Sequence, residues 1–308
     1  MKLKAALIVT ITMFSYSLQA QNVPVTRKGG AALFKQGKIK EAEDLFTKAI
    51  DQLPDSAWPY VGRATARVKL KDTSGAVDDY TKAISVDKNY PSAYSGIGMI
   101  EFYRNHYDSA LKYLNKAIDL KPEEAPEAYA FRGIIKDHQG DTAAALVDFN
   151  KAIELKPNMS EAFCGRGALK FEKKDYKGAL KDYTKASTVS ADMIDAFVGK
   201  GKAMSKMKNF DGAADAFNAA LNLNDNYAPA YDGEGFMKIE QKDYKAAVSC
   251  YNKAIKADPK NGLYYADRGM AELNVKNSDK EACADLNKAK DLGYSDPEME
   301  SALSSNCN

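Results

Sequence analysis

Alanine recurs along this chain at a nearly constant interval, and that interval constrains the fold more than any other feature. One alanine series has gaps of 34 or 35 residues, and a second series follows seven residues behind it. The first series is Ala42, Ala76, Ala110, Ala145, Ala179, Ala213, Ala247 and Ala282. A period of this size is typical of a solenoid, in which one supersecondary unit is repeated and stacked. Because a solenoid works through an extended surface, the period also favours a binding role over a catalytic cleft.

Other positions repeat in the same register. When the first alanine is numbered as repeat position 20, position 8 is small, position 4 is aromatic in seven units and position 24 is large. Positions 4, 8 and 11 share one face of a first helix, and positions 20, 24 and 27 share one face of a second helix. The pattern therefore predicts a helix–turn–helix unit in which small residues let the two backbones approach closely. Runs such as Gly96-Ile97-Gly98 fall inside these helices, so they indicate close packing and not a phosphate loop.

Helix start and stop signals also recur. Asp141, Asp175 and Asp243 stand where a second helix should begin, as N-caps do. Proline ends four of the units and orients the next helix. These prolines are Pro54, Pro122, Pro157 and Pro259.

In all these positions the chain resembles the tetratricopeptide repeat family over residues 23–296. The resemblance implies an all-α fold, a right-handed α-solenoid of eight helix–turn–helix units within residues 21–296. The units are 23–56, 57–90, 91–124, 126–159, 160–193, 194–227, 228–261 and 262–296. A short capping helix is expected in residues 297–308, with Asp296-Pro297 at its start and Met299, Ala302 and Leu303 along one side.

Some units depart from the pattern. Thr26 replaces the aromatic residue at position 4 of the first unit, so we expect that first helix to fray. Other residues replace the closing proline in four units, which predicts looser turns there. These residues are Lys88, Ala191, Asp225 and Tyr294.

The first twenty residues are typical of a secretory signal peptide. Lys2 and Lys4 precede an uncharged apolar run, and Ala20 is a small residue before a polar junction. The alternative, a membrane anchor, is less favoured because the apolar run is short for a bilayer, and no integral membrane span is expected elsewhere. We therefore expect an exported protein that is periplasmic or outer-membrane-associated, or secreted.

Charge and side-chain chemistry exclude several classes of function. Without the leader the chain carries 42 basic and 42 acidic residues, which does not favour a nucleic-acid partner. Only His106 and His138 supply imidazoles, and the spacings of metal sites and catalytic triads are missing, so we expect no enzyme, no metal and no cofactor. Carboxylates such as the recurring aspartate at position 23 are interpreted as surface features of helices. That series is Asp79, Asp148, Asp182 and Asp285.

Two of the four cysteines form a candidate pair. Cys283 holds a position that should face the capping segment, and Cys307 lies near the end of that segment. In an oxidising compartment a Cys283–Cys307 disulfide would staple the cap, whereas the alternative is two buried thiols. Cys164 and Cys250 lie two units apart on different helices, too far to pair.

The candidate binding surface lies on the first helices. In the resembled family, positions 2, 5, 9, 12 and 13 line a concave groove, and in this chain many of them are apolar or aromatic. The candidate groove residues are Met99, Phe102, Tyr103, Ile134, Phe171, Lys202, Lys206, Phe236, Ile239 and Met270. Such a surface favours an extended or helical protein segment with hydrophobic anchors. The alternative is that several of these side chains only pack between neighbouring first helices.

These observations predict a non-catalytic protein-interaction scaffold of the cell envelope. It would bind a peptide or protein segment on its concave face and support complex assembly or regulation. The alternative is a self-associating or glycan- and cell-wall-associated structural protein that uses its convex or terminal faces. A chaperone-type carboxylate clamp is not favoured, because position 6 is never asparagine from the second unit on.

Overall fold

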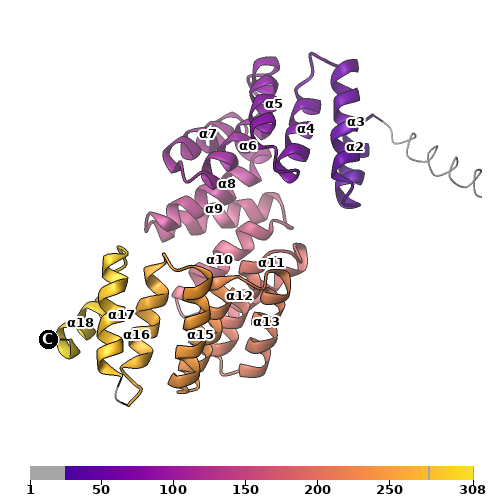
Figure 1. Ribbon diagram of the computed structural model, residues 1–308. Coiled ribbons are helices and arrows are strands. Elements are labelled where there is room, and N and C mark those ends of the chain that lie inside the picture. Colours follow the sequence, from indigo (N-terminus) through magenta and orange to yellow (C-terminus); the bar gives the residue numbers. More distant parts are fainter. Residues whose placement is uncertain (1–24, 277, 308) are drawn as a thin grey trace, which may run out of the picture. The chain divides into compact units, whose positions relative to one another are not determined.

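The computed structural model describes residues 25–276 and 278–307 (Figure 1). This part of the chain holds 17 α-helices, one short 3-10 helix and no strand, so the predicted all-α class is confirmed. The candidate signal peptide, residues 1–20, lies outside the described residues. The helices form two compact units that divide between Ile135 and Lys136, and we describe each unit by itself.

Helices alternate regularly in both units. The N-terminal unit contains α2 (Arg27–Lys35), α3 (Ile39–Gln52), α4 (Ala57–Lys69), α5 (Thr73–Val86), α6 (Pro91–Tyr103), α7 (Tyr107–Leu120), η1 (Pro122–Glu124) and most of α8 (Pro126–His138). The C-terminal unit continues with α9 (Thr142–Leu155), α10 (Ser160–Glu172), α11 (Tyr176–Val189), α12 (Ile194–Lys206), α13 (Phe210–Leu223), α14 (Ala228–Glu240), α15 (Tyr244–Ala257), α16 (Gly262–Glu272), α17 (Asp279–Asp291) and α18 (Pro297–Asn306). The even-numbered helices α2–α16 are the first helices of the repeats, and the odd-numbered helices α3–α17 are the second helices.

Glycine pairs explain how the helices approach one another. Phe217, at position 24, lies against Gly201 of its own repeat and Gly233 of the next repeat. A Cβ atom at Gly201 or Gly233 would come within 2.5 or 2.3 Å of the Phe217 ring, closer than atoms can pack. Each Gly-x-Gly run therefore packs against two side chains at position 24, because its first glycine contacts the preceding repeat and its second contacts its own. The close packing predicted from the sequence is therefore present. The sequence analysis did not predict that the two glycines of a run contact different repeats.

Several tyrosines at position 4 donate a hydrogen bond to the turn before their repeat. The hydroxyl of Tyr94 donates to the Lys88 carbonyl at 3.0 Å, and that of Tyr231 donates to the Asp225 carbonyl at 2.7 Å. Tyr60 makes the same bond to the carbonyl of Pro54 at 3.1 Å. The turns at Lys88 and Asp225, which lack the closing proline, therefore still have a hydrogen bond that holds them.

Side-chain caps begin most second helices. Asp141, Asp175 and Asp243 accept hydrogen bonds from backbone N–H groups three residues on, which confirms these three predicted caps. Thr26 caps α2 in the same way, and α2 has 9 residues where the next first helix, α4, has 13. In the first unit, where Thr26 stands in place of the aromatic residue, the first helix is therefore shorter and begins with a side-chain cap.

The position-23 aspartates are buried, so their interpretation as surface features was wrong. Asp182 is 2 % exposed and Asp79 is 3 % exposed. Each carboxylate is paired with basic residues of the preceding first helix, as Asp79 is with Arg63 and Arg67. Arg63 and Arg67 stand at positions 7 and 11, one helical turn apart, so they converge on one carboxylate. In the last repeat position 11 is Glu272, and Asp285 is paired with Arg268 at position 7. A buried carboxylate needs such partners, because burial without them is strongly unfavourable.

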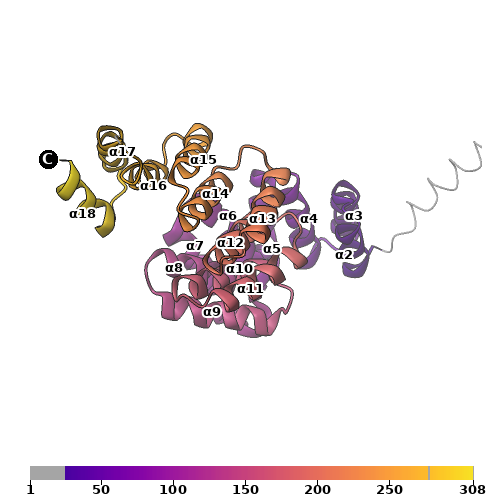
Figure 2. The ribbon, with the colours of Figure 1, turned by 90° about the horizontal axis from the view of Figure 1, so that it is seen from below.

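The C-terminal unit ends in a capping helix. Asp296 accepts hydrogen bonds from the backbone N–H groups of Glu298 and Met299, and α18 buries Met299 and Ala302 against α16 and α17. Figures 1 and 2 both show α18 beside α16 and α17. The Cα atoms of Cys283 and Cys307 are 5.4 Å apart and their sulfurs are bonded, which links α17 to the end of α18.

Candidate functional site

All ten candidate groove residues lie on first helices, and eight of them fall into two groups. One group belongs to the N-terminal unit and the other to the C-terminal unit, so the two are treated separately. We refer to the surfaces that carry them as the first-helix faces of the two units.

The first-helix face of the N-terminal unit presents an aromatic cluster. The ring of Phe102 lies 5.3 Å from that of Tyr103 and 5.2 Å from that of Phe131, and Tyr103 and Phe131 are 5.8 Å apart. Met99 and Ile134 are half-buried and pack beside Phe102 on the same hydrophobic core. Tyr103 is 68 % exposed although it belongs to this cluster. The structure therefore brings four candidate residues together and leaves one large aromatic side chain facing solvent.

A cavity of about 350 Å³ lies in the same unit, and Met99 is one of its walls. Helices α4, α5, α6 and α8 contribute its lining. The lining residues are Val61, Thr65, Tyr80, Ser92, Ser95, Gly96, Met99 and Glu127. Ser95 is 3 % exposed, and its hydroxyl has no hydrogen-bond partner. Burial raises the pKa of the Tyr80 hydroxyl, and the Glu127 carboxylate raises it further.

On the first-helix face of the C-terminal unit, the candidate side chains already contact other side chains of that unit. Lys202 donates to Asp232 and Lys206 donates to Glu240, each over 2.7 Å. The Lys206 ammonium also lies 4.8 Å from the centre of the Phe236 ring. Phe171 approaches Phe236 with ring centres 6.4 Å apart. In this unit the candidate residues contact one another, as expected if these side chains only pack between neighbouring first helices.

Beside this group lies a pair of carboxyl groups. Burial raises the pKa of Asp267 to about 8, and the charge of Asp232 acts in the same direction. At neutral pH Asp267 therefore holds a proton, while Lys202 neutralises Asp232. Asp267 stands at position 6, where the other described repeats of this unit have glycine.

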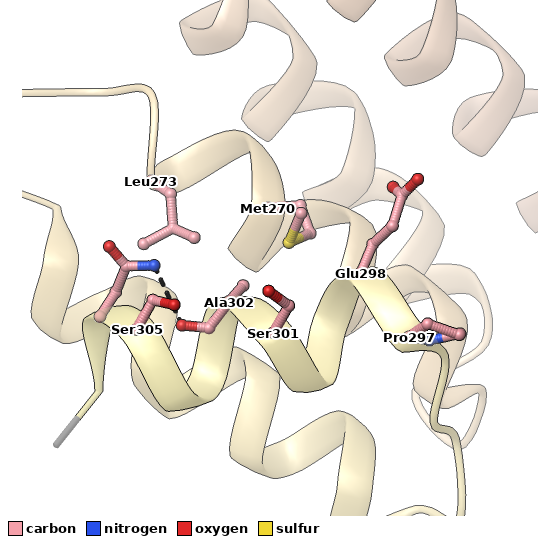
Figure 3. A pocket seen from close by; sticks show the side chains of 8 residues that line it. Met270, Leu273, Pro297, Glu298, Ser301, Ala302 and Ser305 are labelled. Carbon is pink, nitrogen blue, oxygen red and sulfur yellow. Dashed lines mark hydrogen bonds between the residues drawn. The ribbon is translucent and has the colours of Figure 1, made fainter.

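Ile239 and Met270 lie apart from both groups. Ile239 packs against the core formed by Ala247, Tyr251 and Ala271. Met270 of α16 and Leu273, the residue that follows this helix, face α18 across a shallow groove of about 510 Å³, as Figure 3 shows. Glu298, Ser301 and Ser305 form the other side of that groove (Figure 3).

Within residues 25–276 and 278–307, no cluster of three or more His, Cys, Asp or Glu side chains is arranged to hold a metal ion. In the same part of the chain no helix is both long and apolar enough to cross a membrane. Cys164 and Cys250 are free thiols there, and burial raises the pKa of Cys164 to about 12.

Sequence reasoning missed Ser95, Glu127 and Asp232. Ser95 and Asp232 occupy position 5 and Glu127 occupies position 2, both of which belong to the groove positions of the resembled family. At position 5 the units before Ser95 and Asp232 have Val61 and Val198, so a polar residue there was a signal in the sequence.

Comparison with known proteins shows what this arrangement is similar to. Residues 95–160 and 228–261 match sequence profiles described as tetratricopeptide repeat. A tetratricopeptide repeat protein from Parabacteroides merdae has a similar fold, with a TM-score of 0.59 and 19 % identity over 82 % of this chain and 99 % of that one. Cut9–Hcn1 of the APC/C gives a TM-score of 0.67 with 18 % identity, over 86 % of this chain and 52 % of the matched chain. The chain therefore contains tetratricopeptide repeats in an α-solenoid.

Curated relatives share only a segment. Human RNA polymerase II-associated protein 3 is 31 % identical over 105 residues, which is 34 % of this chain and 16 % of that protein. Human mitochondrial import receptor subunit TOM70 is 33 % identical over 94 residues, which is 30 % of this chain and 16 % of the receptor. The matched segment thus spans about a sixth of either relative. Repeats of this kind act as protein-interaction scaffolds.

Proposed function

We propose that this protein is a non-catalytic scaffold of the cell envelope that binds a peptide or protein segment on its concave, first-helix surface. The binding region is the first-helix face of the N-terminal unit, and complex assembly or regulation is the outcome. The exposed ring of Tyr103, set on the Phe102–Phe131 cluster, is the observation that carries this proposal. An aromatic side chain with a buried base and an exposed ring is a common anchor for a partner.

The N-terminal unit is favoured over the C-terminal unit because its surface is open. In the C-terminal unit Lys202, Lys206 and Phe236 already have partners within the chain, and those contacts would have to break before a segment could bind. The N-terminal unit has a cavity beside Met99 and an exposed aromatic ring next to it.

Export to the envelope is supported by the sequence of residues 1–20 and by the Cys283–Cys307 pair. The leader has the charge and apolar pattern of a signal peptide. Disulfides persist in oxidising compartments such as the periplasm and the cell exterior. Expression of the full chain followed by N-terminal sequencing tests this part, with Gln21 as the expected first residue of the exported protein.

Binding is tested by crosslinking in native envelopes followed by recovery of the tagged chain. Tyr103→Glu places a charge on the aromatic cluster, and Val147→Glu is the matched control because Val147 is 66 % exposed on a second helix. We expect partner recovery to fall at least fivefold with Tyr103→Glu and to stay unchanged with Val147→Glu. Recovery that depends on Val147 and not on Tyr103 would favour the alternative of a structural protein that uses its convex face.

A further inference from the structure

The cavity beside Met99 suits a neutral ligand. Val61, Met99 and the Tyr80 ring supply apolar wall, and the cavity volume of about 350 Å³ lies in the range of small-ligand sites. No basic side chain is among its eight lining residues in the described chain, so an anionic group would have no counter-charge there. Glu127 already has an interaction within the chain, so its carboxylate is no free counter-charge for a cation. Burial of a charge without a partner is strongly unfavourable, which leaves neutral groups as the ligands that fit.

Ser95 lines this cavity and gives independent support for a ligand. Its hydroxyl is buried and has no hydrogen-bond partner in the described chain, an unfavourable state that buried polar groups rarely keep. Thr65 donates its one hydroxyl proton to the Val61 carbonyl at 2.8 Å. Tyr80, whose oxygen lies 3.4 Å from Thr65 Oγ1, is therefore the donor of that second pair. The Ser95 O–H thus lacks an acceptor, whereas the Tyr80 oxygen can still accept a hydrogen bond.

We propose that this cavity receives a tyrosine side chain of the bound segment, an inference that rests on the proposed function. The ligand ring would lie against Val61, Met99 and the Tyr80 ring, where the Met99 thioether adds a favourable sulfur–aromatic contact. The phenol oxygen would accept from the Ser95 hydroxyl, and the phenol O–H would donate to the Tyr80 oxygen. Ligand and cavity then satisfy each other, because a phenol is both a donor and an acceptor.

Other neutral side chains fit the same cavity less well. Phenylalanine matches the apolar wall but leaves the Ser95 O–H without an acceptor, and such a mismatch discriminates against it. Tryptophan has the same fault, because its indole N–H only donates. Asparagine and glutamine can accept, but their amide N–H groups would face apolar wall without partners. Serine and threonine would leave part of the cavity empty and lose packing contacts.

The test uses the full chain labelled with 13C at its methionine methyl groups. Met99 reports on the cavity, and Met207, exposed on the C-terminal unit, is the internal control. N-acetyl-tyrosinamide serves as the probe, and N-acetyl-phenylalaninamide, which differs only in the hydroxyl, is the comparison. We expect a saturable shift of the Met99 resonance with the tyrosine probe, at least fivefold weaker binding of the phenylalanine probe, and no shift of Met207.

Two variants locate the hydroxyl that matters. Ser95→Ala should weaken binding of the tyrosine probe at least fivefold and leave that of the phenylalanine probe unchanged, so that the preference disappears. Ser85→Ala is the matched control, because Ser85 is an exposed serine of α5 in the same unit and is not among the lining residues. It should change neither affinity.

The stability of Ser95→Ala separates lost binding from lost folding. Since the Ser95 hydroxyl has no partner in the free chain, its removal should not lower the unfolding midpoint in urea. A lowered midpoint, equal binding of the two probes, a preference that Ser95→Ala keeps, or no saturable Met99 shift would overturn the tyrosine assignment. This titration needs no partner protein, so its failure is separate from a failure of the Tyr103→Glu recovery experiment.

Discussion

Arg166 holds the Asp182 carboxylate through two hydrogen bonds, from Nε to Oδ2 and from Nη2 to Oδ1, each 2.8 Å long. Lys170 adds a third contact at 2.7 Å. Arg268 and Asp285 form the same two-pronged pair in the last repeat. The pair therefore joins the first and second helices of a repeat through a buried charge.

Removal of this carboxylate should destabilise the fold. Asp182→Ala leaves the Arg166 and Lys170 charges without their partner, and we expect the free energy of unfolding to fall by about 2 kcal/mol. The measurement is urea denaturation of the purified chain. Asp215→Ala is the control, since Asp215 is exposed on the next second helix and its loss should cost less than about 0.5 kcal/mol. Equal midpoints for the two variants would contradict the role of the pair.

Asp182 and Asp267 should give opposite pH dependences. Burial alone would raise the pKa of Asp182, but the hydrogen bonds from Arg166 and Lys170 outweigh it and lower the pKa below 3.8. Its contribution to stability is therefore present above pH 3.8 and is lost as pH falls through the lowered pKa. The pKa of Asp267 is raised from 3.8 to about 8, so stability declines as pH rises between these two values.

Asp267→Asn should remove the second effect. The amide keeps the size of the side chain but cannot ionise, so its advantage over the natural residue should be near zero at pH 4 and exceed about 1 kcal/mol at pH 9. Unfolding midpoints in urea across that pH range give the comparison. Parallel pH profiles for the variant and the natural chain would show that Asp267 does not titrate as described.

The glycines that flank Phe217 should tolerate no side chain. Gly233→Ala would place a Cβ within 2.3 Å of the ring, and we expect a loss of about 1–3 kcal/mol from overpacking. A second substitution, Phe217→Leu, should recover part of that loss because it makes room. The N-terminal unit already shows such an exchange, since Leu114 at position 24 is followed by Phe131 at position 6. A double variant no more stable than Gly233→Ala alone would argue against this packing.

The Cys283–Cys307 bond should stabilise the capping helix. The two cysteines are 24 residues apart, and closing a loop of this size contributes ~3 kcal/mol in the chain-entropy description. Cys307→Ser should lower the unfolding midpoint accordingly, whereas Cys250→Ser changes a free thiol and serves as the control. Intact mass should rise by about two daltons on reduction. An unchanged mass would mean that the pair is not bonded in the exported protein.

Sequence periodicity predicted the helix pairs well because every repeat obeys the same packing rule. Small residues at positions 8 and 20 and large ones at position 24 fix how the two helices of a repeat pack together. The repeat positions alone were therefore enough to locate the helices. The sequence analysis did not predict the residue in the left-handed (αL) backbone conformation at the turn between the two helices of a repeat. Lys71, Asn105, Lys174, Lys208 and Lys242 have positive φ, at the repeat position where Gly37 and Gly140 stand.

The candidate site was harder to predict, since repeat position states which helix face a residue occupies but not what it contacts. Phe236 and Tyr103 both stand at groove positions, yet Phe236 is covered by Lys206 and Tyr103 is exposed. That difference depends on pairs such as Lys206–Glu240, which join neighbouring repeats. The burial of the position-23 aspartates likewise depends on basic residues of another helix.

Site-specific photo-crosslinking tests whether the first-helix face of the N-terminal unit binds a protein partner. A benzophenone-bearing residue replaces Tyr103 in one chain and Val147 in another, two sites of nearly equal exposure at 68 and 66 %. After irradiation of native envelopes, adducts are identified by mass spectrometry. We expect a discrete protein adduct from position 103 and none from position 147. An adduct from position 147 with none from position 103 would show that the first-helix face of the N-terminal unit is not the binding surface.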